Sequence, residues 1–291
     1  MPRRVRPATI TTPRGSFAAL VAPAALGVSE RHPALLVPGY TGSKEDFLAV
    51  LESLAAGGRS VTAIDMRGQY QSDRARGSDG YALSQLAEDL LAVAAVAGGA
   101  GGRVHLLGHS FGGLIARQAV LAEPAGFLSL TLLGSGPGTI GGVRAQALGE
   151  FLEFVGPAGN DTGALSGRIG QIWEQRLGPQ AVADGVSADV LGFLRGRLLG
   201  SCPVGLTEMA RHLLDCPDLT AQLAAVAMLP KLVGYGENDD AWPPEVQDLM
   251  AVRIGAERVR IPGAGHSPAV EAPETTAAML TAFWNAAEPP W

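Results

Sequence analysis

A chain of 291 residues, 47% hydrophobic and 17% charged, is long enough for one large α/β domain and too apolar to be mostly disordered. A net charge of −6, with no Lys/Arg run after the first six residues, argues against a nucleic-acid partner. No stretch of 18 apolar residues lacks a charge or proline, and no apolar segment follows the basic N-terminus, so we expect no membrane span, no signal peptide and a cytoplasmic protein.

The first 65 residues contain the pattern of a sheet with its first helix. Apolar and alternating residues at 8–12 and 16–22 flank a Pro-Arg-Gly turn, which predicts an N-terminal hairpin. The apolar run at 34–37 and the β-branched run at 60–65 are typical of buried parallel strands. Between them, the apolar spacing at 47–54 predicts a helix.

Strands and helices continue to alternate as far as residue 133. We expect a helix at 83–97, a strand at 104–107, a helix beginning near residue 114 and a strand at 128–133. Alternation over short loops predicts an α/β fold, with a mostly parallel, doubly wound sheet of about eight strands and helices on both faces.

The pattern changes at residue 140. From there to residue 229 we find no strand, and the predicted helices, which glycines separate, are 143–154, 163–177, 179–197 and 203–214. Strands are predicted again at 231–235 and 258–261, with helices at 245–252 and 273–285. The expected domains are therefore a core formed by residues 1–139 and 230–291, and a helical cap at 140–229 that covers one end of the sheet.

The junction between the strand at 104–107 and the next helix reads Gly108-His109-Ser110-Phe111-Gly112. Gly-x-Ser-x-Gly between a strand and a helix indicates a nucleophile elbow, in which glycines allow a turn too sharp for side chains. An ordinary turn with a helix-capping serine is the alternative. The elbow requires a base and an acid elsewhere in the chain, and the ordinary turn does not.

A serine nucleophile needs a histidine base within hydrogen-bond reach. His266 lies in a glycine-rich loop after the last predicted strand, where the carboxyl ends of parallel strands converge. A surface histidine is the alternative. The other four histidines fit the role less well, because they fall in the elbow strand, in the turn, before the first parallel strand and in the insertion: His105, His109, His32 and His212.

The carboxylate that orients the histidine should also follow a strand. Asp239 comes directly after the strand at 231–235, and Ser110, Asp239, His266 is the chain order expected for this architecture. Glu237 and Asp240 are close enough to be confused with it. A solvated acidic loop is the alternative.

These motifs together resemble the α/β-hydrolase family. The resemblance covers nearly the whole chain outside the insertion and rests on residues 108–113, 65–68, 236–239 and 265–268. It implies that the acid three residues after the strand-ending glycine, Asp239, completes a triad with Ser110 and His266. It also implies that the insertion is the family's cap.

The resemblance further implies an oxyanion hole formed by the backbone N–H groups of Phe111 and Tyr40. The chain departs from the family pattern in two places. Pro38 stands where the family usually has histidine, which leaves the backbone donor intact, and residues 69–72 replace a common His-Gly-x-Ser, which we expect to alter the pocket shape. We interpret Asp65 and Arg67 as structural.

A serine nucleophile implies an acyl-enzyme, and hence an ester, thioester, lactone or amide substrate. We expect hydrolysis of a carboxylic ester of a small, partly apolar molecule, with no metal and no organic cofactor. The alternatives on the same fold are a cofactor-free haloperoxidase or perhydrolase, an aminopeptidase, a lyase and a non-catalytic ligand-binding protein.

The substrate pocket is expected to include four residues: Trp242, His109, Phe151 and Trp173. The alternative for the cap aromatics is that they pack the cap helices against one another. We interpret Cys202 and Cys216 as two buried free thiols rather than a disulfide. The sequence gives no indication of the oligomeric state.

Overall fold

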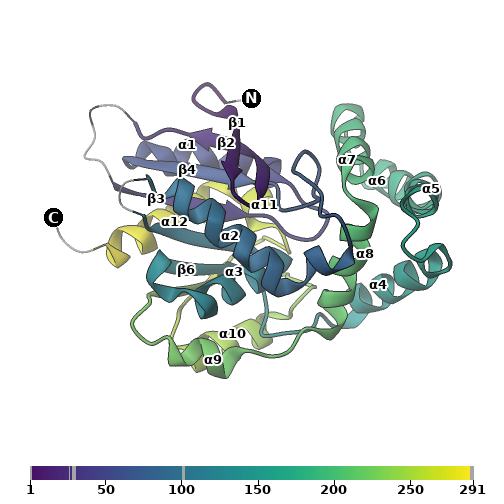
Figure 1. Cartoon of the computed structure of the whole chain (residues 1–291). Coiled ribbons are helices and arrows are strands. Elements are labelled where there is room, and N and C mark those ends of the chain that lie inside the picture. Colours follow the sequence, from purple (N-terminus) through teal and green to yellow (C-terminus); the bar gives the residue numbers. More distant parts are fainter. Residues whose placement is uncertain (1, 26, 28–30, 100–101, 289–291) are drawn as a thin grey trace.

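One continuous eight-stranded sheet organises the computed structural model, which describes residues 2–25, 27, 31–99 and 102–288 (Figure 1). The described strands are β1 (Arg6–Thr12), β2 (Gly15–Ala22), β3 (Arg31–Val37), β4 (Arg59–Ile64), β5 (Val104–His109), β6 (Phe127–Leu133), β7 (Lys231–Gly236) and β8 (Glu257–Ile261). Their order in the sheet is β1-β2-β4-β3-β5-β6-β7-β8. β2 pairs antiparallel with β1 and β4, and the other pairings are parallel. The predicted fold class and the N-terminal hairpin are confirmed.

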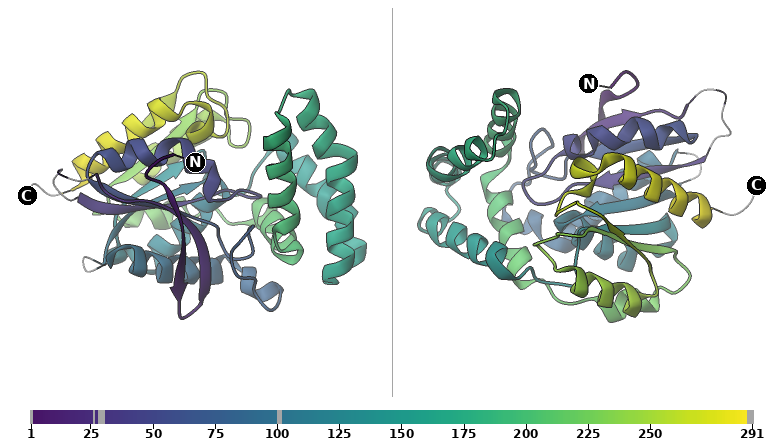
Figure 2. Two further views of the ribbon diagram at one scale, coloured as in Figure 1. Left: turned by 90° about the horizontal axis from the view of Figure 1, so that it is seen from above. Right: turned by 180° about the vertical axis from the view of Figure 1, so that it is seen from behind.

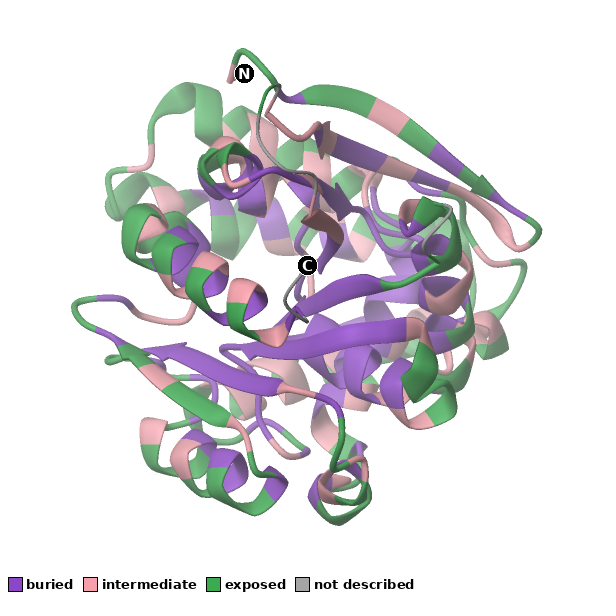
Figure 3. Cartoon of the chain, turned by 90° about the vertical axis from the view of Figure 1, so that its left-hand side faces the viewer, coloured by how far each residue is buried: buried purple, intermediate pink, exposed green. Residues whose placement is uncertain are grey.

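A hydrophobic core lies on each face of the sheet, because successive side chains of a strand point to opposite faces. Leu35 and Leu106 pack into the core covered by α2 (Leu83–Ala97) and α3 (Phe111–Ala122). Leu36 and Leu107 pack into the other, covered by α1 (Leu48–Ala56) and α12 (Pro273–Ala287). Figure 3 shows the buried strands between these helical layers. Burial on both faces explains the continuous apolar runs in the sequence.

Shorter helices complete the described core. These are α9 (Thr220–Ala225), α10 (Pro244–Ile254), α11 (Pro268–Glu271) and the 3-10 turns η1 (Lys44–Phe47), η2 (Ser78–Tyr81) and η4 (Pro124–Gly126). In η1 the side chain of Asp46 accepts a hydrogen bond of 3.2 Å from the backbone N–H of Ser43. This contact satisfies a backbone N–H at the start of the turn.

A run of helices and no strand connects β6 to β7 in the described chain. Its members are α4 (Gly142–Val155), η5 (Gly156–Ala158), α5 (Thr162–Ile172), the π-helical turn η6 (Trp173–Leu177), α6 (Gly178–Ala183), α7 (Ala188–Gly200) and α8 (Pro203–Asp215), before α9. The helix predicted at 179–197 is two helices, since Gly185 between them has a φ of +77°. The sequence reading did not predict α9.

These inserted helices stand beyond one end of the sheet (Figure 2). Val155, Leu165 and Ile169 form a small core of their own with Leu206 of α8. The same α8 contributes Met209 to the large core on the sheet. The insertion therefore has its own packing and is joined to the rest of the molecule through α8.

Both cysteines are buried and unpaired, as expected. Within the described residues, the helices are each too short or too polar to cross a membrane.

Candidate active site

Ser110 occupies a strained turn between β5 and α3, with φ 54° and ψ −121°. The glycines around it are needed for close backbone contacts. A Cβ at Gly108 would lie 2.3 Å from the carbonyl oxygen of Gly112, and a Cβ at Gly112 would lie 2.4 Å from that of Pro38. No side chain fits at either position, so the motif is a real elbow in the backbone.

His266 joins Ser110 to Asp239. Its Nε2 lies 2.9 Å from the Ser110 Oγ, and its Nδ1 lies 3.0 Å from the Asp239 Oδ1. The loop after β8 supplies the histidine and the loop after β7 supplies the acid. Loops far apart in the sequence meet here because the parallel strands end at one edge of the sheet.

Asp239 and its two acidic neighbours have different hydrogen-bond partners in the structure. Asp239 is buried and also accepts hydrogen bonds from the backbone N–H of Ala241 at 2.9 Å and from Gln247 Nε2 at 3.0 Å. Glu237 instead accepts from the backbone N–H of residue 263, at 3.2 Å, and the exposed Asp240 pairs with an arginine of α4 at 2.7 Å. Of these three acids, Asp239 is the one bonded to His266.

Two opposing effects set the charge of Asp239. Burial raises the pKa of the carboxyl, but the His266 contact and the hydrogen bonds from Ala241 and Gln247 outweigh it, so the net pKa lies below its ordinary value. Asp239 is therefore a carboxylate at neutral pH. A carboxylate accepts the proton on Nδ1 and leaves the Nε2 lone pair directed at Ser110.

Sequence reasoning missed Gln247. It is fully buried in the first turn of α10, and its Nε2 donates to Asp239 Oδ2 and, at 2.7 Å, to the carbonyl oxygen of Trp242. Nothing in the sequence marks this glutamine. A polar residue early in a helix is ordinarily solvated, so its contact with the acid appears only in the folded chain.

The segment after β3 packs directly on Ser110. A Cβ at Gly39 would lie 2.9 Å from the Ser110 Cβ, so the Gly39–Tyr40 peptide is held against the serine. Phe111 is the first residue of α3, where backbone N–H groups have no acceptor within the helix. The two predicted oxyanion donors thus lie on segments that adjoin the Ser110 side chain.

A cavity of about 730 Å³ opens above these residues. The core lines it with residues 39–42, His109, Ser110 and His266, and the insertion lines it with mostly apolar side chains, among them Leu148, Phe151, Phe154, Ile169, Ile172 and Leu198. Of the four expected pocket residues, His109 and Phe151 are therefore in the lining. Burial lowers the pKa of His109 to about 4, and Nε2 lies 2.8 Å from the carbonyl oxygen of His266.

The two expected tryptophans lie elsewhere. Neither is among the described residues that line this cavity. Trp173 borders a separate hollow of about 620 Å³ within the insertion. Trp242 is buried, and its indole N–H donates to the carbonyl oxygens of Gly138 and Thr139 at 3.2 and 3.1 Å. Trp242 therefore braces the loop after β6, and its ring centroid is 6.4 Å from that of His266.

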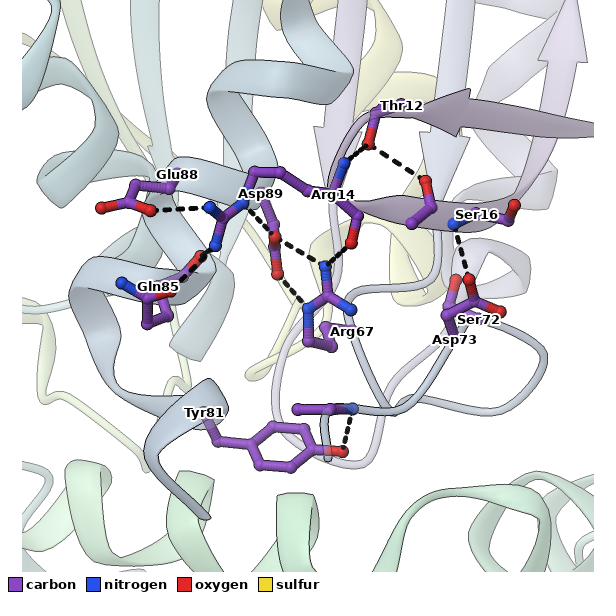
Figure 4. A network of polar contacts seen from close by, with 12 residues as sticks. Thr12, Arg14, Ser16, Arg67, Ser72, Asp73, Tyr81, Gln85, Glu88 and Asp89 are labelled. Atoms are coloured by element: carbon purple, nitrogen blue, oxygen red, sulfur yellow. Dashed lines mark hydrogen bonds and ion pairs between the residues drawn. The ribbon is translucent and has the colours of Figure 1, made fainter. Parts of the chain in front are cut away.

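Asp65 and Arg67 bind neighbouring backbone and side chains. Asp65 accepts from the backbone N–H and the Nζ of Lys44 at 2.7 and 2.9 Å. Arg67 binds Asp89 and donates to the carbonyl oxygen of Arg14 at 2.6 Å (Figure 4). These contacts agree with a structural role. In the part of the chain that is described, no group of three or more His, Cys, Asp and Glu residues could hold a metal ion.

Known proteins are similar to this chain in sequence and fold. The model of the alpha/beta hydrolase family matches residues 34–279. The chain is 30% identical over 264 residues to the dihydrolipoyllysine-residue acetyltransferase component of the acetoin cleaving system of Pseudomonas putida, covering 89% of this chain and 65% of that protein. The chain thus spans less than two thirds of that relative.

A second relative matches over almost its full length. The pimeloyl-(acyl-carrier protein) methyl ester esterase of Edwardsiella ictaluri is 28% identical over 257 residues, covering 86% of this chain and 92% of that one. A thermophilic esterase structure from Thermogutta terrifontis superposes with a TM-score of 0.74 at 22% identity, covering 98% of this chain and all of that one. The chain belongs to the alpha/beta hydrolase family.

Proposed function

We propose that the protein hydrolyses a carboxylic ester through an acyl-enzyme, with Ser110 as nucleophile, His266 as base and Asp239 as the orienting acid. The observation that carries the proposal is the unbroken line of contacts from Ser110 Oγ through both ring nitrogens of His266 to Asp239 Oδ1, at 2.9 and 3.0 Å. These distances are within the reach that proton transfer requires.

The proposed cycle has two halves. The Ser110 Oγ attacks the ester carbonyl carbon and gives its proton to His266 Nε2, while Asp239 stabilises the imidazolium. The backbone N–H groups of Tyr40 and Phe111 bind the oxyanion that forms. Collapse of this intermediate expels the alcohol, which takes the proton from His266. Water then gives a proton to His266, attacks the acyl carbon and releases the acid, and the serine recovers its proton.

The cavity supports a partly apolar small molecule as the substrate. Its lining from the insertion is mostly aliphatic and aromatic, and two of its arginines are paired with carboxylates in the same lining, Arg197 with Asp46 and Arg176 with Glu150. Paired charges favour a neutral ligand over an ionic one. The esterase name of the Edwardsiella ictaluri relative supports an ester. In this proposal residues 140–229 act as the cap of the pocket.

The test uses p-nitrophenyl esters of graded chain length and a fluorophosphonate probe. We expect the unaltered chain to release p-nitrophenol and to become labelled at Ser110, which peptide mass mapping will locate. The variant Ser110→Ala should keep its melting temperature and lose both properties. No release and no labelling would overturn the proposal, and so would a Ser110→Ala variant with activity within tenfold of the parent.

A further inference from the structure

Gln69 lies in the segment where this chain departs from the family pattern, and it contacts the loop after β3 that carries the Tyr40 N–H. The side chain is 1% exposed. Its Nε2 donates to the carbonyl oxygen of Gly39 at 2.7 Å, and its Oε1 accepts from the backbone N–H of Met66 at 3.0 Å. Since both ends of the amide are bound, the side chain has one orientation.

The carbonyl of Gly39 and the N–H of Tyr40 belong to the same peptide group. That group is planar, and among the described residues there is no cis peptide bond, so its C=O and N–H point in opposite directions. A donor that holds the carbonyl on one side therefore sets the direction of the N–H on the other. Gln69 provides that donor.

The loop needs such support because its backbone is strained. Thr41, the next residue after Tyr40, has a φ of +57°, a left-handed conformation that is unfavourable for a β-branched residue. The backbone N–H of Gly42 also donates to the Gly39 carbonyl, at 3.1 Å, and closes a turn. The Gly39 oxygen thus accepts one bond from within the turn and one from a separate loop of the core.

We propose that Gln69 is a positioning residue for the reaction: its bond to the Gly39 carbonyl aims the Tyr40 N–H at the substrate oxyanion. The inference rests on the proposed function, since it requires an oxyanion at Ser110. It assigns a role to Gln69 within the segment at 69–72, which on sequence grounds was expected to alter the pocket shape.

The first test is the variant Gln69→Leu, which removes both side-chain bonds at similar volume. A misdirected N–H weakens binding of the oxyanion more than binding of the ester, so kcat should fall by about 10- to 100-fold with KM little changed. Inhibition by a trifluoromethyl ketone, which forms a tetrahedral adduct with the serine, should weaken by the same factor.

A second variant separates positioning from simple support of the loop. Gln69→Glu keeps an acceptor for the Met66 N–H but has no N–H to donate to Gly39. We expect its kcat to fall at least as far as that of Gln69→Leu. If the only role of Gln69 were its hydrogen bond with the Met66 N–H, the kcat of Gln69→Glu would be close to that of the parent.

The matched control is Gln71→Leu. Gln71 lies two residues further along the same loop, and its Oε1 accepts from the Nζ of Lys44 at 2.8 Å. This variant loses a side-chain hydrogen bond of the loop without touching the Gly39–Tyr40 peptide, and its kcat should match the parent.

The outcomes separate the two proposals. Ser110-dependent hydrolysis with a Gln69→Leu kcat within threefold of the parent, or with unchanged ketone inhibition, overturns the role of Gln69 alone. An unaltered chain that neither hydrolyses esters nor reacts with fluorophosphonate overturns the proposed function and, with it, this inference.

Discussion

Two histidines of this protein are each bonded to a serine and a carboxylate, near opposite ends of strand β5. His266 lies between Ser110 and Asp239 beyond the carboxyl end of the strand. His105, at the other end, has Nδ1 2.8 Å from Ser129 Oγ and Nε2 3.1 Å from a carboxylate oxygen of residue 288. The two sets share the same three kinds of group at similar distances.

The two sets differ in whether a substrate could reach the serine. Ser110 is lifted by a strained turn into a cavity of about 730 Å³, whereas Ser129 is a fully buried residue inside strand β6. The His105 ring is completely buried and stacked on Trp284. A serine, a histidine and an acid in contact therefore do not by themselves predict catalysis. The adjoining cavity and the oxyanion donors proposed above distinguish the Ser110 set.

The charge balance differs as well. Glu288 also binds two guanidinium groups, that of the fully buried Arg59 at 2.8 Å and that of Arg31 at 3.3 Å, so its negative charge is balanced by arginine. Asp239 instead has neutral donors, Ala241 and Gln247, besides His266. The contacts of Glu288 hold the C-terminal segment against the sheet. The contacts of Asp239 leave a carboxylate that can stabilise a charged imidazole.

The largest expected effect is on Asp239. Asp239→Asn should lower kcat by about 10³- to 10⁴-fold, because an amide at this position favours the wrong tautomer of His266. Steady-state kinetics on a p-nitrophenyl ester measure the loss. Asp240→Asn is the control and should leave kcat unchanged, since Asp240 pairs with Arg144 at the surface. A larger loss in Asp240→Asn would reassign the acid.

Replacing the acid of the buried set, Glu288, by its amide should affect the stability of the fold rather than catalysis. Glu288→Gln leaves Arg59 buried without its partner charge and should lower the free energy of unfolding by about 3–5 kcal/mol. Denaturant titration measures this loss, and kcat under native conditions should stay at the parental value. A stable variant with reduced kcat would show that the two sets are coupled.

Low pH should lower the folding stability that the buried set of Ser129, His105 and Glu288 contributes. Burial, followed by the charge of Arg59, lowers the pKa of His105 to about 4, although Glu288 opposes the shift. The native state therefore binds fewer protons than the unfolded chain between pH 6.5 and 4, so stability falls as pH falls through this window, by up to about 3 kcal/mol at pH 4. His105→Gln should lose less stability between pH 7 and 4 than the parent. Equal losses would contradict the assignment.

The smallest expected effect concerns the turn that distinguishes Ser110. Gly112→Ala places a Cβ against the carbonyl oxygens of residues 37 and 38 and should destabilise the fold by about 1–3 kcal/mol. In the insertion, a Cβ at Gly167 of α5 meets nothing within 4 Å. Gly167→Ala should therefore stabilise by about 0.5–1 kcal/mol. Thermal unfolding of both variants tests the contrast, and equal shifts would show that the elbow tolerates a side chain.

Much of the fold could be predicted from local patterns. The apolar runs of the parallel strands are continuous because both faces of the sheet are covered, and the predicted helix at 83–97 coincides with α2. The break at Gly185 in the insertion was missed, because glycines recur throughout that segment without a periodic signal. The short helix α9 was also missed.

Sequence alone determined the order of the strands and helices, and it indicated which loops meet, because parallel strands place their carboxyl ends at one edge of the sheet. Only the tertiary structure decided which side chains touch within those loops. It placed Trp242 and Trp173 outside the cavity lining and brought Gln247 and Gln69 to the site. Such contacts depend on packing between segments distant in the chain, and periodicity reports only the face on which a residue lies.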